Sequence, residues 1–226
     1  MRSIQQDIIQ KTLTRLTLMA LSAFLVGCGG GSSSSTPSNT TITTITTSAG
    51  VSDYTTLSLT NLSNYAAPVL PLYYDETTVA LDNTPSNSAV SNQIATLGRV
   101  LFYDKRLSIN DTISCSSCHQ QASGFDDPRR FSVGFSGATF TTAHAMRLGN
   151  IRYYQPGSMF WDKRAASIEL QASQPIQHPI EMGFVAGVGG IPALINKMNA
   201  SSYYPDLFSF AFGDAVITET RIQQAL

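Results

Sequence analysis

Cys115-Ser116-Ser117-Cys118-His119 decides how the rest of this chain is interpreted. The stretch has the form C-x-x-C-H, which is the attachment sequence of a c-type haem. Two thiols one helical turn apart can add to the two vinyl groups of a haem, and the imidazole of the next residue then binds the iron from the proximal side. The motif therefore predicts covalent haem c on Cys115 and Cys118, with His119 as an iron ligand.

Three other interpretations of the motif have to be weighed. The two cysteines could form a disulfide, a thioredoxin-like redox pair or half of a zinc site. A redox pair is expected in a βαβ setting, and a four-ligand zinc site needs a further Cys or His pair at short spacing. Neither is present, and two of the three cysteines lie in the motif. Haem attachment is therefore favoured.

The composition is typical of a folded domain. The 226 residues are 42% hydrophobic and 13% charged, with a formal net charge of −1. Because there is no basic excess, we expect no nucleic-acid partner. The chain from about residue 85 onward is long enough to bury one sizeable core.

The N-terminal residues predict export and a lipid anchor. In residues 1–27 basic side chains are followed by an apolar run that is too short for a typical transmembrane helix. This pattern is that of a signal peptide. The run ends in Leu25-Val26-Gly27-Cys28, which is similar to a bacterial lipobox and would make Cys28 the lipidated first residue. An ordinary cleavage site is the alternative. Gly29 stands where an inner-membrane retention signal usually has Asp. We therefore expect a lipid-anchored periplasmic protein and favour the outer membrane.

Three segments follow the signal peptide. Residues 28–50 are rich in Gly, Ser and Thr and predict a flexible tether. Residues 51–84 predict an extended lead-in, and residues 85–226 an all-α c-type cytochrome domain with long loops around one covalently bound haem. Helices are expected at about 86–103, at the haem motif, and at 163–172, 191–198, 204–212 and 217–226, with a long loop at 123–142.

Six blocks of sequence, taken in order, resemble one family. They are Leu97-Gly-Arg-Val-Leu-Phe-Tyr-Asp-Lys-Arg-Leu-Ser108, Ser114-Cys-Ser-Ser-Cys-His119, Gly124-Phe-Asp126, Ser132-Val-Gly134, Phe160-Trp-Asp-Lys-Arg164 and Glu169-Leu-Gln-Ala-Ser-Gln-Pro-Ile-Gln-His-Pro-Ile-Glu-Met-Gly183. Together they resemble the N-terminal haem domain of the bacterial di-haem cytochrome c peroxidases and the related MauG-type enzymes. Family members continue into a second domain with another C-x-x-C-H motif. The resemblance therefore implies a fragment of a longer protein, with a single-haem derivative as the alternative.

The resemblance also implies roles for four residues on the distal side of the haem. Glu181 matches a glutamate that stands over the peroxidatic haem, and its apolar neighbours would raise its pKa so that one carboxyl can take and return a proton. Gln171 would hydrogen-bond the iron-bound oxygen, and Pro175 would shape the apolar wall. Trp161 matches the residue between the two haems. The plainer alternatives are a solvent-facing carboxylate for Glu181, an exposed polar residue for Gln171 and core packing for Trp161.

Two positions depart from the family pattern. Phe135 stands where some family peroxidases carry a His that ligates the resting haem, so the distal pocket is expected to be open without activation, as in the MauG-like branch. His144 could serve as a sixth ligand instead, the alternative being a surface or propionate-contacting His. It occupies roughly the place of an Asn that helps to bind calcium in the family, which leaves calcium in doubt as a cofactor here.

Three functions are compatible with these residues. The first is a haem peroxidase that reduces hydrogen peroxide with electrons from a periplasmic cytochrome c or cupredoxin. The second is an electron-transfer cytochrome whose iron is closed by His144 or by one of three methionines, Met146, Met159 or Met182. The third is an oxidase-like maturation enzyme that acts on a protein, as the resemblance to MauG allows. Family members are often dimers, so a homodimer is also open.

Overall fold

The computed structural model describes residues 49–86 and 88–226, all within one folded unit that covers residues 44–226. The predicted signal peptide, the lipidated Cys28 and nearly all of the predicted tether lie outside the described residues. Within the described part the secondary structure is helical, with three isolated β-bridges and no strand. The all-α class is thereby confirmed. No described helix has the length and hydropathy of a membrane span.

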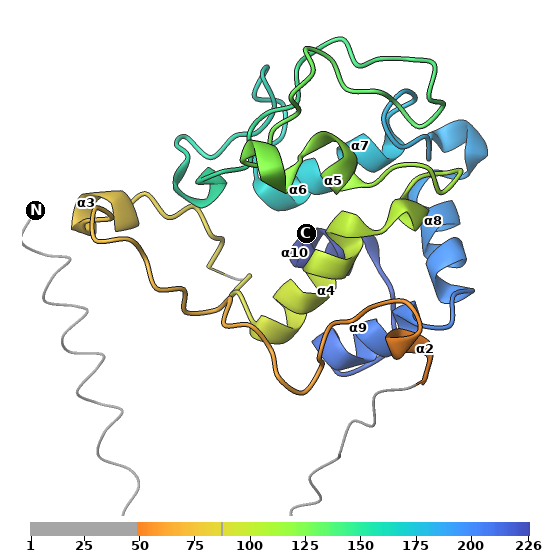
Figure 1. Ribbon diagram of the computed structural model, residues 1–226, viewed down its shortest axis with the longest axis horizontal. Coiled ribbons are helices and arrows are strands. Elements are labelled where there is room, and N and C mark those ends of the chain that lie inside the picture. Colours follow the sequence, from red (N-terminus) through yellow and green to blue (C-terminus); the bar gives the residue numbers. More distant parts are fainter. Residues whose placement is uncertain (1–48, 87) are drawn as a thin grey trace, which may run out of the picture. The chain divides into compact units, whose positions relative to one another are not determined.

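Helix α4 (Asn92–Tyr103) runs through the middle of the helical core (Figure 1). It was expected to begin at about residue 86, but Ser91 is extended and its side chain accepts a hydrogen bond from the Ile94 N–H, so the helix begins there. Val90 lies before this cap and is 41% exposed. The predicted apolar face is present, because Leu97 and Leu101 are fully buried.

Three C-terminal helices complete the core: α8 (Gly190–Asn199), α9 (Tyr204–Phe212) and α10 (Glu219–Ala225). Each was predicted from its apolar spacing to within about two residues. Helix α4 packs mainly against α9 and α10. The fully buried side chains at the centre of this core include Leu97, Leu101, Leu107, Ile176, Leu194, Leu207, Phe208 and Ile222.

The described residues before α4 run largely without regular structure. Within them lie two short helices, α2 (Ala49–Ser52) and α3 (Glu76–Val79). Val51 is buried in the core, and the Tyr65 and Ala66 N–H groups donate to the Asn92 side chain at the start of α4. This part of the chain is therefore fastened to the helical core by specific contacts.

The haem motif forms a short helix, α5 (Cys115–Cys118), as predicted. Single 3₁₀ turns flank it, η1 (Lys105–Leu107) and η2 (Gln121–Ser123), and two more follow, η3 (Ile151–Tyr153) and η4 (Ala186–Val188). The predicted long loop at 123–142 is confirmed, since its only regular pairings are two isolated bridges, Gln120–Asp126 and Val133–Phe140.

The helix expected at 163–172 begins later than predicted. Helix α6 is Ile168–Ala172, because Ser167 is extended and accepts a hydrogen bond from the Leu170 N–H. Lys163 has a positive φ of 60°, which a helix does not allow. Helix α6 ends at Ala172, the predicted end, and so stops before Pro175. A separate short helix, α7 (Gln174–Gln177), follows directly, and Pro175 is tolerated in its first turn.

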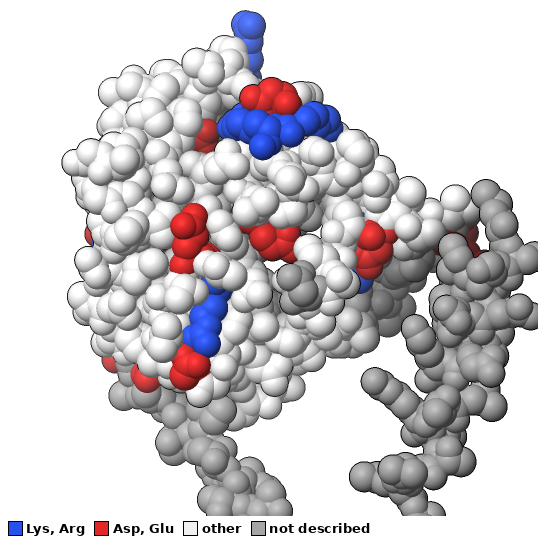
Figure 2. All heavy atoms as spheres, turned by 180° about the vertical axis from the view of Figure 1, so that it is seen from behind, with Lys and Arg blue, Asp and Glu red and all other residues white. Residues whose placement is uncertain are grey.

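Charged side chains are sparse on the described surface. On the face in Figure 2, acidic and basic groups mostly lie beside one another on a largely uncharged surface. The ion pairs of the described residues include Arg221 with Asp214 and Arg152 with Asp82.

Candidate functional site

The cysteines of the motif are held on one turn of α5. Both thiols are free of any disulfide. Desolvation raises the pKa of Cys115 to about 12 and also raises the pKa of Cys118, so both are protonated thiols at neutral pH. Among the described residues no group of three or more His, Cys, Asp and Glu side chains is placed to hold a metal ion.

His119 is oriented by its backbone surroundings. Its Nδ1 lies 3.3 Å from the Phe125 carbonyl oxygen, which can accept a hydrogen bond from that nitrogen. A histidine that donates through Nδ1 presents the lone pair of Nε2, the arrangement usual for a metal-bound imidazole. Desolvation lowers the pKa of His119 and so favours the neutral, metal-binding form.

A buried carboxylate that follows the motif in sequence is hydrogen-bonded to neighbouring loop residues and, through an arginine, is linked to the motif. Asp127 accepts a hydrogen bond from the Ser132 hydroxyl at 2.7 Å and from Arg129 Nε at 2.9 Å. Arg129 also reaches the Ser117 carbonyl at 3.3 Å. The sequence offered no signal for this network, since its members are ordinary loop residues until the fold brings them together around α5.

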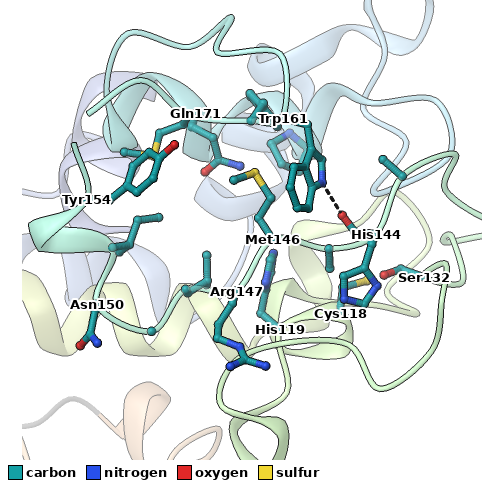
Figure 3. Close-up of a pocket in the computed structure, with 18 of the residues that line it drawn as sticks. Cys118, His119, Ser132, His144, Met146, Arg147, Asn150, Tyr154, Trp161 and Gln171 are labelled. Carbon is teal, nitrogen blue, oxygen red and sulfur yellow. Dashed lines mark hydrogen bonds between the residues drawn. The ribbon is translucent and has the colours of Figure 1, made fainter. Parts of the chain in front are cut away.

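One cavity of about 990 Å³ joins the haem motif to the residues predicted for the distal side (Figure 3). Its volume is at the upper end of the range for ligand cavities, as a large planar cofactor requires. The residues that line it include Cys118, His119, Trp161, Gln171, Pro175 and Glu181. These positions are spread over 64 residues of sequence, from 118 to 181, and the fold brings them to one place.

Glu181 follows α7 in a tight turn and lines the cavity with a side chain that is 31% exposed. Desolvation raises the pKa of its carboxyl, although the nearby His178 and Arg164 oppose the shift. His178 Nδ1 faces the N–H groups of Ile180 and Glu181, both at 3.3 Å. The same nitrogen lies 3.6 Å from Glu181 Oε1, which is too long for a hydrogen bond.

The backbone around Glu181 is held by a neighbouring loop. The Phe135 N–H donates to the carbonyls of Ile180 and Glu181 at 3.1 and 3.0 Å. Gly134 approaches so closely that a Cβ there would lie 2.1 Å from the Ile180 oxygen. Phe135, the residue that departs from the family pattern, is therefore a support of Glu181 and is not among the residues that line the cavity.

Trp161 lies at an open edge of the cavity. Its side chain is 64% exposed, and its indole Nε1–H donates to the His144 carbonyl at 2.9 Å. Core packing is thus not its role within the described residues. The hydrogen bond fixes the indole against the segment that contains His144.

His144 has both ring nitrogens engaged. Nδ1 lies 3.1 Å from the Arg130 carbonyl, and Nε2 lies 2.9 Å from Asp126 Oδ1. The hydrogen bond to the Arg130 carbonyl raises the pKa of His144, which favours the charged imidazole with protons on both nitrogens. In this arrangement neither nitrogen can bind iron, so the structure does not favour His144 as a sixth ligand.

The methionines named as alternative ligands differ in their positions. Met146 and Met159 line the cavity, whereas Met182 is buried in the helical core. Figure 3 shows Met146 between His119 and Gln171. Gln171 projects into the same space, and its carboxamide makes no hydrogen bond within the described residues, so it is available to a ligand.

Sequence analysis missed one part of the cavity wall. Tyr74, Thr78 and Leu81 come from the lead-in before α4, and Asn150 and Tyr154 come from the segment around η3. No motif marks these residues. Their place in the cavity depends on contacts between segments about 70 residues apart.

Comparison with known proteins gives one consistent result. A family model described as di-haem cytochrome c peroxidase matches residues 92–226. The methylamine utilization protein MauG of Methylophilus methylotrophus is 32% identical over 147 residues, which are 63% of this chain and 40% of that protein. The cytochrome c551 peroxidase of Nitrosomonas europaea is 32% identical over 150 residues, which are 63% of this chain and 39% of that protein.

Solved structures agree with these matches. The crystal structure of a MauG-like protein associated with microbial copper homeostasis has a TM-score of 0.56 and 30% identity, covering 69% of this chain and 44% of that one. The diheme peroxidase BthA of Burkholderia thailandensis, in its Y463M variant, shares the fold with a TM-score of 0.51, at 23% identity over 62% of this chain and 39% of that one. The chain thus spans about two fifths of the length of these relatives.

Proposed function

Because this chain belongs to the di-haem cytochrome c peroxidase family, we propose that it is the haem-binding part of a peroxidase that reduces hydrogen peroxide. The electrons would come from a donor protein such as a cytochrome c or a cupredoxin. The observation that carries the proposal is the single cavity in which His119 and Cys118 meet Gln171, Pro175 and Glu181. The relatives named as cytochrome c peroxidases support it.

The residues present fit a covalently bound haem c. Two thiols one turn apart, an imidazole whose Nδ1 faces a carbonyl and an adjoining cavity of about 990 Å³ are the donor set and the space that the cofactor needs. Cys115 and Cys118 would hold the haem covalently, and His119 Nε2 would bind its iron. The bound haem would supply the iron that holds peroxide and passes electrons to it.

The chain's own residues would manage the protons of the reaction. Reduction of one hydrogen peroxide takes two electrons and two protons and yields two waters. Glu181 would accept a proton from one oxygen of the peroxide and return it to the other oxygen, which would leave as water. A carboxyl whose pKa is raised by desolvation holds a proton more readily than an ordinary glutamate, which suits it to both steps. The Gln171 carboxamide donates a hydrogen bond to the peroxide, and Pro175 excludes water from that side.

The direct test is peroxide turnover by the haem-loaded protein with Glu181→Gln. We expect the rate of peroxide reduction to fall by about 10²–10⁴-fold, the usual contribution of a positioned acid–base group. Glu169→Gln is the matched control, because Glu169 lies nearby on α6 but does not line the cavity. Equal turnover by the two variants would remove Glu181 from the proposed mechanism.

A second candidate function is electron transfer without peroxidase activity. The observation that favours it is the position of Met146 between His119 and Gln171 in the cavity (Figure 3). A thioether on the iron would close the site to peroxide and stabilise the ferrous state. Conversion of a low-spin to a high-spin ferric spectrum by Met146→Leu would support this function over the first.

We also propose that the protein is exported to the periplasm and anchored through lipid on Cys28. The support is the sequence alone, in which basic residues and an apolar run precede Leu25-Val26-Gly27-Cys28. Metabolic labelling with a radioactive fatty acid tests the proposal. The wild-type chain should be labelled and partition with membranes, and label retained by Cys28→Ser would contradict the assignment.

A further inference from the structure

The segment Tyr74–Asn83, called the arm here, contributes to the cavity although it precedes the residues matched to the family, 92–226. Tyr74, Thr78 and Leu81 line the cavity together with Asn150 and Tyr154. In Figure 3 Asn150 and Tyr154 lie on the opposite side of the cavity from Cys118 and Ser132. The arm therefore meets the cavity at the end remote from the cysteines.

An ion pair fastens the arm to the segment around η3. Arg152 Nε and Nη2 both donate to Asp82 Oδ2, at 2.9 and 2.6 Å. The two side chains are only partly exposed, at 28% for Asp82 and 38% for Arg152. The hydrogen bond from Arg152 holds the pKa of Asp82 well below its usual range, so the pair is charged at all ordinary pH values.

Asn83 makes the most specific contact of the arm. Its Nδ2 donates to the carbonyls of Ile151 and Tyr154, both at 2.9 Å, and its backbone N–H donates to the Arg152 carbonyl at 2.9 Å. Its Oδ1 is buried without a partner. The side chain is thus held by its two amide donors, which only an amide in this orientation supplies.

Further contacts lie on either side of Asn83. Gln155 Nε2 donates to the Leu81 carbonyl at 2.9 Å, and the Tyr74 hydroxyl donates to Asn150. The Tyr74 and Tyr153 rings meet edge to face with centroids 5.2 Å apart. Both ends of the arm are therefore fixed to residues 150–155, which form part of the cavity wall themselves.

We propose that the arm is a size-selecting wall of the haem cavity: it closes the end at Asn150 and Tyr154 and excludes bulky molecules while small ones still reach the iron side. The proposal rests on the haem of the proposed function being bound in the cavity, but not on peroxide being its substrate. It assigns the selectivity to a segment that precedes the residues matched to the family and contacts them at residues 150–155.

The test compares Asn83→Asp with Asn64→Asp in the full-length, haem-loaded protein. Asn83→Asp keeps the shape of the side chain but places an oxygen against the Ile151 and Tyr154 carbonyls, which should release the arm. Asn64→Asp is the matched control, because Asn64 makes the same kind of bond to the Ala67 carbonyl at an exposed site before the arm. Two quantities are measured. One is the rate at which cyanide and 4-phenylimidazole bind to the ferric protein, and the other is the rate of hydrogen exchange in residues 74–83 and 141–154.

We expect Asn83→Asp to speed hydrogen exchange of the arm and to raise the binding rate of 4-phenylimidazole relative to cyanide by about tenfold or more, as the loss of one or two hydrogen bonds at a barrier predicts. Asn64→Asp should leave the ratio unchanged. An unchanged ratio with a released arm would overturn the proposal, as would an arm whose exchange is not altered even when Asp82→Asn is added. Failure of cyanide to bind the iron in every variant would also overturn the proposal, because a molecule that small should pass the wall.

These outcomes are separable from failure of the proposed function. A protein that shows size selection but no reduction of peroxide would contradict the peroxidase and leave the arm proposal standing. A protein that reduces peroxide, but whose ratio of 4-phenylimidazole to cyanide binding rates is unchanged by release of the arm, would support the peroxidase and contradict the arm proposal.

Discussion

At the scale of single residues, the proposed chemistry depends on a carboxyl that the fold keeps partly out of water. Glu181 lies in a turn between buried Ile176 and Met182, and its backbone is held by Phe135. Because desolvation raises its pKa, the folded protein favours the protonated carboxyl more than the unfolded chain does. The same burial that suits Glu181 to proton transfer therefore makes its charged form unfavourable for folding.

Glu181→Gln should stabilise the protein at neutral pH. The raised pKa means that the stability from this group is fully present below its ordinary value of 4.5 and is lost as pH rises through the higher folded value. Glutamine is neutral throughout, so the free energy of unfolding of the variant should increase relative to that of the wild type as pH rises from 4 towards 8. Urea unfolding of both haem-loaded proteins across that range measures the difference. Parallel stability curves would contradict the raised pKa.

At the scale of elements, the core depends on a close crossing of α4 and α10. A Cβ built on Gly98 would lie 1.7 Å from the Ala225 carbonyl oxygen, so only glycine permits this approach. The crossing brings the C-terminal helix onto α4, whose own C-terminus leads directly into η1 and the loop before the haem motif. A substitution at this crossing should lower the free energy of unfolding before it alters the cavity.

Gly98→Ala should lower the free energy of unfolding by about 3 kcal/mol, because the two helices must separate to admit the methyl group. The loss outweighs the gain in helix propensity from alanine, which is about 1 kcal/mol. Gly187→Ala is the control, since a Cβ there meets nothing within 4 Å. The account of the crossing would fail if thermal or urea unfolding gave the two variants equal stability.

The sequence predicted the elements where one apolar face dominates. Helix α9 begins and ends where predicted, and the buried Leu97 and Leu101 of α4 follow from their spacing. Errors arose where the backbone decided the start of a helix. Several serines precede α4, and the one that caps it is Ser91. Helix α6 starts late because Lys163 has a positive φ and Ser167 caps the helix. The close crossing at Gly98 could not be predicted either, since a single glycine inside a helix does not indicate which other helix packs against it.

At the scale of the whole molecule, the candidate site joins a motif, a distal block and an arm. The motif and Glu181 could be found from the sequence, the first by its spacing and the second by resemblance to a family. The arm could not, because the Asp82–Arg152 pair and the Asn83 hydrogen bonds join segments about 70 residues apart and carry no local pattern. Likewise, only coordinates could show that both nitrogens of His144 are engaged.

The central claim is that His119 and Glu181 face one open cavity in which peroxide can reach a haem iron. The most direct measurement is the absorption spectrum of the ferric, haem-loaded, full-length protein before and after peroxide is added. The account predicts a high-spin spectrum that changes when peroxide is added. A low-spin spectrum that is indifferent to peroxide would contradict the claim and would identify the chain as an electron-transfer domain with its iron already closed.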